Sequence, residues 1–146
     1  MNELIIFNNP KFGEIRTVES GLKDTYLGVV YAVEYGDKLK IGYSTKPYTR
    51  IMVLKRNAEK YGNMALGRVC ISSPHTNYRE IESFLHGRFA DLRIEGTELF
   101  NIKFDDFVKI FRFEKINFKD ETESIRRRSQ AFFNGLKGFI IGEKYE

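Results

Sequence analysis

The feature that most constrains this chain is an apolar run that ends at a two-residue turn. Residues 27–35 (LGVVYAVEY) are almost continuously apolar and rich in valine and tyrosine, which is typical of a buried strand. Gly36-Asp37 separates this run from residues 38–43 (KLKIGY), in which apolar and polar side chains alternate. Gly-Asp between two such segments favours a tight β-hairpin. We therefore expect a hairpin inside a sheet, around which the rest of the chain must fold.

The turn also predicts which residues of the hairpin face one another. Centring the loop on Gly36-Asp37 places Val33 opposite Lys40 and Tyr31 opposite Gly42. Facing residues share one side of a sheet, so Tyr31, Lys40 and Gly42 point the same way, and the two long side chains are within reach. A glycine opposite the tyrosine leaves space for a ligand to approach. The residues alone leave open whether this face is reactive or simply an exposed sheet face.

The first residues of the chain predict a second hairpin. Residues 3–7 and 14–18 have the composition of short strands, and they flank the turn-forming sequence Asn8-Asn9-Pro10. We therefore expect residues 1–22 to form an N-terminal β-hairpin extension.

Strands and helices alternate after the central hairpin. Ser44, Thr45 and Pro47 predict a helix with a capping hydroxyl, which Gly62-Asn63 should end. Strands are expected over residues 65–71 and 98–102. Asn77 followed by Glu80 is a capping-box pattern that opens a second helix. Asp105 and Asp106 suit the first turn of a third helix, where the helix dipole favours acids. A fourth helix is expected over residues 120–134. The expected core stripes of the first three helices are Ile51, Leu54, Ala58 and Tyr61, then Ile81, Phe84, Leu85 and Phe89, then Phe104, Phe107, Val108 and Phe111.

This pattern predicts one domain of the α/β or α+β class, with a small twisted, mixed or antiparallel sheet flanked by helices. The length of 146 residues fits a single domain. The sequence shows no membrane span and no signal peptide, so we expect a cytoplasmic protein without membrane contacts. The single cysteine, Cys70, excludes an intrachain disulfide and a multi-thiolate zinc site.

Positive charge is concentrated in one segment, in which Glu59 is the single acid. The basic residues there are Lys38, Lys40, Lys46, Arg50, Lys55, Arg56, Lys60 and Arg68. Such an asymmetry favours a polyanionic partner, with nucleic acid as the first candidate. A solvated helix face rich in lysine is the alternative, and composition does not separate the two.

The order of these motifs resembles the GIY-YIG nuclease superfamily. VVYAV is followed by KIG nine residues after the tyrosine and by an arginine ten residues after the lysine, and LHGRFADLRIEGTELF lies downstream. The likeness is greatest to a small phage-associated branch with KIGYT and GEWF motifs. It covers residues 27–116 and implies a nuclease-like domain over residues 25–116, with residues 117–146 as a helical extension.

The resemblance implies a role for each matching residue. Tyr31 corresponds to the tyrosine of the first motif, Lys40 stands where the second motif usually has tyrosine, and Arg50 matches the helix arginine. Glu98 matches the glutamate that binds one Mg²⁺ or Mn²⁺, while Leu99 stands where the family has tryptophan. These residue types suit phosphodiester hydrolysis: a carboxylate holds the metal and a guanidinium binds phosphate. Either Tyr31, helped by the neighbouring Lys40 ammonium, or Lys40 itself would be the base.

Several further residues are candidates for the site. At the start of its helix, Arg50 would lie beside free backbone N–H groups. Glu82 and His86 are four residues apart on one helix face, which fits a metal pair, a proton relay or a structural histidine, and we take His86 as a candidate catalytic residue. Asn101 is the candidate for the family's asparagine. The candidate DNA contacts are Lys46, Arg50, Lys55, Arg56 and Arg93, with Arg126-Arg127-Arg128 as further possible contacts.

A shorter resemblance lies at the start of the chain. IFNNPKFGEIRTVESG is similar to the opening hairpin of BRO-type prophage antirepressor domains, which implies a phage or prophage origin and DNA as the partner. We therefore predict a metal-dependent DNA endonuclease without a small-molecule cofactor. The alternatives are a catalytically inactive DNA-binding regulator on the same fold and a protein-binding inhibitor of host defence.

Overall fold

The computed structural model describes residues 2–8, 12–62, 65–116 and 118. Within them, five strands and four α-helices form one domain with a single sheet, so the expected α+β class is confirmed. The elements are β1 (Leu4–Phe7), α1 (Phe12–Leu22), β2 (Val29–Tyr35), β3 (Lys38–Ser44), α2 (Pro47–Tyr61), β4 (Leu66–Ser72), α3 (Tyr78–Arg88), the 3-10 helix η1 (Ala90–Leu92), β5 (Leu99–Phe100) and α4 (Phe104–Phe113).

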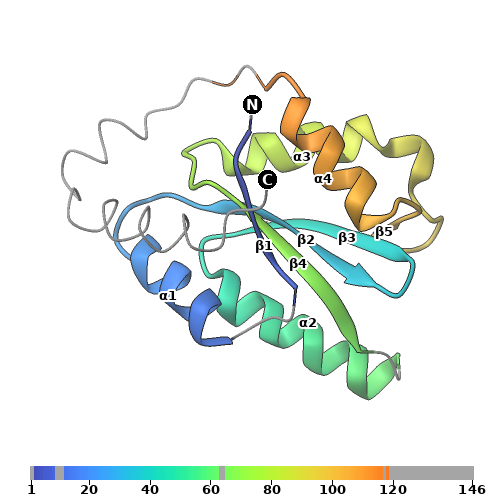
Figure 1. Ribbon diagram of the computed structural model, residues 1–146, viewed down its shortest axis with the longest axis horizontal. Coiled ribbons are helices and arrows are strands. Elements are labelled where there is room, and N and C mark those ends of the chain that lie inside the picture. Colours follow the sequence, from blue (N-terminus) through green and yellow to red (C-terminus); the bar gives the residue numbers. More distant parts are fainter. Residues whose placement is uncertain (1, 9–11, 63–64, 117, 119–146) are drawn as a thin grey trace.

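The sheet has the strand order β1-β4-β2-β3-β5, and each neighbouring pair among these strands is antiparallel. The central hairpin has the predicted register, with Tyr31 opposite Gly42 and Val33 opposite Lys40. Helices α1 and α2 cover one face of the sheet, and α3 and α4 cover the other (Figure 1). The Tyr31 and Lys40 face is therefore covered by helices, and it is not an exposed sheet face.

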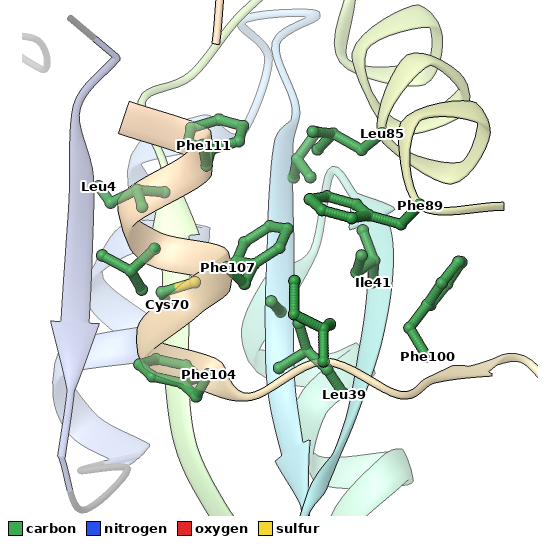
Figure 2. Close-up of a cluster of buried hydrophobic side chains, with 14 of the residues drawn as sticks. Leu4, Leu39, Ile41, Cys70, Leu85, Phe89, Phe100, Phe104, Phe107 and Phe111 are labelled. Atoms are coloured by element: carbon green, nitrogen blue, oxygen red, sulfur yellow. The ribbon is translucent and has the colours of Figure 1, made fainter. Parts of the chain in front are cut away.

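The alternation of side chains along each strand divides the core in two. Leu39 and Ile41 of β3 point toward α3 and α4, where they meet the phenylalanines of α4 (Figure 2). Tyr31 and Val33 of β2 point to the opposite face, into a second cluster that includes Ile51 and Leu54 of α2. The expected helix stripes are buried, except that Phe84 is only partly buried and the Tyr61 side chain lies outside the described residues.

The predicted N-terminal hairpin is wrong. Its first strand is present as β1, but residues 14–18 lie within helix α1 and form no strand. Ile15, Val18 and Leu22 follow a helical spacing, and all three are buried against the α2 face of the sheet. β1 pairs with β4, Ile5 opposite Ile71, so the segment completes the sheet instead of extending from it.

Two predicted caps are also absent. The hydroxyl of Ser44 accepts a hydrogen bond from the Lys46 N–H, and neither Lys46 at the start of α2 nor Asn77 at the start of α3 makes a side-chain cap.

The predicted strand over 98–102 shortens to Leu99–Phe100. The predicted helix over residues 120–134 and the Arg126-Arg127-Arg128 run lie outside the described residues. No helix in the described part of the chain has the length and apolar character needed to cross a membrane.

Candidate active site

A cleft of about 620 Å³ lies between α2, strand β3 and the loop that leads into β5. It is lined by Tyr35, Lys40, Arg50, Leu54, Asn57, Arg93, Gly96, Thr97, Glu98 and Leu99. Four of the predicted site residues thus share one cavity: Lys40, Arg50, Arg93 and Glu98. Tyr31 is buried outside this lining and is hydrogen-bonded to Arg50.

Tyr31 is buried, and its ring lies over Gly42 on the neighbouring strand. A Cβ atom at Gly42 would be 2.5 Å from the Tyr31 hydroxyl oxygen, so only glycine fits here. The space predicted for a ligand is therefore filled by the tyrosine itself. Burial raises the pKa of Tyr31, and the hydrogen bond and charge of Arg50 offset this only in part. Tyr31 is consequently a neutral phenol at neutral pH.

Lys40 and Glu98 form an ion pair at the mouth of the cleft. β3 pairs with β5 at Lys40 and Leu99, which places Glu98 beside the lysine, and Lys40 Nζ lies 2.6 Å from Glu98 Oε2. The side chain of Lys40 is 10% exposed and that of Glu98 is 69% exposed. The hydrogen bond and charge of Lys40 lower the pKa of Glu98. The expected partnership of Lys40 with Tyr31 is thus replaced: Lys40 pairs with Glu98, and Arg50 contacts Tyr31.

The donor set at the cleft suits a hydrated divalent cation. No group of three or more histidine, cysteine, aspartate or glutamate side chains gathers within residues 2–8, 12–62, 65–116 and 118, so this part of the chain forms no all-protein metal cage. Mg²⁺ commonly retains most of its waters and uses one or two carboxylates. Glu98, an exposed carboxylate kept ionised by its neighbour, fits that mode of binding.

A sequence profile of the T5orf172 domain matches residues 25–115 of this chain. The chain belongs to the T5orf172 domain family. This domain occurs in phage-associated and nuclease-type proteins. No curated protein matches the chain significantly, and no solved structure does so either. The match covers the central hairpin, α2 and the cleft, whereas β1 and α1 lie before the matched segment.

His86 of this T5orf172 domain lies away from the cleft lining, on the α3 side of β3. Its Nε2 donates a hydrogen bond to the Ile41 carbonyl at 2.9 Å, and its ring meets the Phe100 ring edge-on at 5.0 Å. A Glu82 oxygen lies 3.6 Å from the same nitrogen. Burial raises the pKa of Glu82, and the charges of His86 and Lys40, which lower it, offset this only in part. This geometry favours the structural alternative for His86, because the imidazole joins α3 to the Ile41 carbonyl of β3 and to the Phe100 ring of β5.

The basic segment contributes fewer free cations to the cleft than its composition indicates. Lys40 and Arg50 of that segment line the cleft, and Arg93, from outside the segment, joins them with its Nε donating to the Thr97 carbonyl at 3.1 Å. Lys55 is paired with Glu59 at 2.6 Å, whereas Lys46 and Arg56 are exposed outside the cleft lining.

Arg68 lies apart from the cleft and is neutralised by two carboxylates. It binds Glu34 at 3.0 Å and Asp105 at 2.8 Å. Asn101 is also elsewhere, where it accepts a hydrogen bond from Lys38. The candidate DNA contacts that meet in the cleft are therefore Arg50 and Arg93.

Helix α1 supports the helix that carries Arg50. The Glu19 carboxylate accepts hydrogen bonds from the Thr49 N–H at 2.8 Å and from the Thr49 hydroxyl at 3.0 Å, and Arg16 donates to the Tyr48 hydroxyl at 2.6 Å. Glu19 thus takes one of the backbone N–H groups that were expected to be free beside Arg50. Nothing in the local sequence indicates this contact, since it joins residues that are 30 positions apart.

Asn57 is a cleft residue that the sequence reasoning missed. It lies two helical turns after Arg50 on α2, so the two side chains share one face of the helix. The helical spacing from Arg50 would have found it. Its amide adds both a hydrogen-bond donor and an acceptor to the cleft.

Proposed function

We propose that this T5orf172 protein is a metal-dependent DNA endonuclease of the GIY-YIG type, encoded by a phage or prophage and acting in the bacterial cytoplasm. The observation that carries the proposal is the meeting of two contacts at one cleft. Arg50 binds the buried Tyr31, and Lys40 binds Glu98 at the mouth of the cleft. A cation that binds the phosphate and a carboxylate that can hold a metal ion are groups that phosphodiester hydrolysis uses, and the Tyr31 hydroxyl positions the cation.

In this proposal each residue has a specific task. Arg50 and Arg93 present guanidinium groups to the phosphate, where planar donors match its oxygens. The raised pKa of Tyr31 disfavours a role as the base. Its neutral hydroxyl instead holds the Arg50 guanidinium in place. Glu98 is the residue that would hold Mg²⁺ or Mn²⁺, and the bound ion would supply positive charge and an acidified water.

A DNA-binding regulator without catalysis is the second candidate. The ion pair between Lys40 and Glu98 favours it, because an ammonium 2.6 Å from the carboxylate competes with a metal ion for the same oxygen. In this case the cleft would bind phosphate through its arginines, and the ion pair would hold the loop before β5 in place.

Plasmid nicking separates the two candidates. Supercoiled DNA is incubated with the parent protein in Mg²⁺, in Mn²⁺ and in EDTA, and binding is measured separately over a range of salt concentrations. We expect nicking that requires the metal, and binding that weakens as salt rises. Arg50→Ala should reduce nicking by about 10²-fold or more.

Glu98→Gln should abolish nicking while DNA binding is retained or slightly improved, because it removes a negative charge beside a polyanion. Glu95→Gln is the matched control, since Glu95 is an exposed acid of the same loop outside the cleft lining, and it should nick normally. A parent protein that binds DNA without nicking it would support the regulator. A protein that neither binds nor nicks would make a protein partner the better explanation.

A further inference from the structure

Two tyrosines and an arginine form an aromatic and cationic cluster where the end of β3 meets the start of α3, on the face of the sheet opposite the cleft. Tyr43 is the sixth residue of β3, and Tyr78 and Arg79 open α3. The Tyr43 and Tyr78 rings lie 5.6 Å apart with an interplanar angle of 43°. The Arg79 guanidinium is 6.0 Å from the Tyr43 ring and 5.6 Å from the Tyr78 ring. We call these three residues the tyrosine platform.

The platform is rigid at its base. Gly28 forms a backbone bridge with His75, and a Cβ atom at Gly28 would lie 2.6 Å from the Tyr78 ring. The ring therefore rests flat against the backbone of Gly28, at a distance that any other residue would prevent. Tyr78 in turn supports Tyr43. Because the Tyr43 ring is already held in place, little conformational entropy is lost when a ligand stacks on it.

The upper part of the platform is open. Tyr43 is 41% exposed, although it contacts a neighbouring ring, and Arg79 is exposed beside it. An exposed aromatic ring next to a guanidinium is the arrangement on which nucleic-acid bases stack, because every base offers a π-face and arginine adds a cation–π contact.

The position of the platform relates it to the cleft. Tyr43 lies three residues beyond Lys40 on the same strand, about 10 Å along β3, and its side chain points to the α3 face of the sheet, whereas that of Lys40 points to the α2 face. β5 pairs with β3 only at Leu39 and Lys40, so among the described strands none pairs with this edge of β3 at Tyr43. A DNA strand that contacts both the cleft and Tyr43 therefore passes around this unpaired edge of β3.

We propose that the tyrosine platform binds an unpaired DNA base, so that the substrate carries a single-stranded segment next to the point of cleavage. This inference rests on the proposed action on DNA and names its substrate class. A paired base in a duplex is already stacked on both faces, whereas an unpaired base has a face free for Tyr43.

Binding of short single-stranded and duplex oligonucleotides of the same sequence, in EDTA so that no cleavage occurs, tests the proposal. Tyr43→Ala should weaken single-strand binding by roughly 5- to 150-fold, the range for loss of one base–aromatic stack. Duplex binding and the salt dependence should stay unchanged, because no phosphate contact is removed. Tyr43→Phe, which keeps the ring, should bind as the parent does.

Tyr26→Ala is the matched control: Tyr26 is 84% exposed and makes no ring or cation contact within the described residues. Thermal melting of each variant establishes that it is folded, and Arg79→Gln gives a second test that leaves both tyrosines in place and should also weaken single-strand binding. Unchanged single-strand binding by folded Tyr43→Ala and Arg79→Gln, or an equal loss for single strands and duplex, would overturn the platform and leave the nuclease proposal intact. A parent protein that binds no DNA would overturn both.

Discussion

Replacing Gly42 with alanine tests the close packing beneath the candidate site. The new methyl group would lie 2.5 Å from the Tyr31 hydroxyl oxygen and 2.6 Å from its Cζ atom. Carbon atoms normally approach to about 3.5–4.0 Å, so the ring has to move by about 1 Å. Tyr31 is only 2% exposed and its ring is rigid, so no rotation of a flexible end relieves the clash.

The expected cost follows from two opposing contributions. Overpacking a filled core costs about 1–3 kcal/mol. Removing a glycine from a strand interior recovers about 0.5–1 kcal/mol, because alanine loses less backbone freedom on folding. The net loss in the free energy of unfolding should therefore be about 1 kcal/mol, within a range of about 0–2.5 kcal/mol.

Urea denaturation measures this difference through the shift in midpoint at an unchanged slope. Gly87→Ala is the matched control, because a Cβ atom at Gly87 in α3 meets nothing within 4 Å. That variant should gain about 0.5–1 kcal/mol from the better helix propensity of alanine. Equal stabilities of the two variants would refute the packing argument. Under the proposed function, Gly42→Ala should also slow nicking, because it displaces the hydroxyl that binds Arg50.

Three further predictions concern the support of the site and the core. Glu19→Ala should lower the free energy of unfolding by about 1 kcal/mol in urea denaturation, because the Thr49 N–H at the start of α2 loses its acceptor; an unchanged midpoint would show that this cap is without effect. Burial raises the pKa of Glu34, but hydrogen bonds from Arg68 outweigh it and set the pKa below its ordinary value of 4.5. The stability from this carboxylate is thus present above about pH 4.5 and lost as the pH falls through the lower folded value, so the parent and Glu34→Gln should converge in acid denaturation. Burial raises the pKa of Cys70 to about 12, so a thiol reagent should label it at neutral pH only as fast as the protein unfolds, and rapid labelling of the native protein would contradict this.

The features that the sequence predicted correctly depend on neighbours along the chain. A two-residue turn and a period of two decide which residues face one another, so the register of Tyr31 with Gly42 follows from Gly36-Asp37. The core stripes of α2, α3 and α4 are similarly local, because helical geometry repeats every 3.6 residues. The side of the sheet shared by Tyr31 and Lys40 was therefore predictable before any tertiary contact was known.

Residues 14–18 show where local reasoning fails. Isoleucine, valine and threonine favour a strand in isolation, but the same segment buries Ile15 and Val18 when it is helical. That burial exists only because the segment docks beside α2, on the sheet face that β2 and β4 provide. The tertiary structure thus overrides the local preference, since the apolar area gained on docking exceeds the small difference in propensity.

The partners within the candidate site were decided in the same way. Lys40 pairs with Glu98, 58 residues later, because β5 adds to the edge of β3, and Arg50 reaches Tyr31 because α2 folds back over that face. Arg68 counts as a surface cation in the sequence, yet Glu34 and Asp105 neutralise it in the folded chain. Sequence spacing determined which side chains share a face of a strand or helix. Only the packing of distant segments decided which charges meet, because the Coulomb energy depends on separation in space and not along the chain.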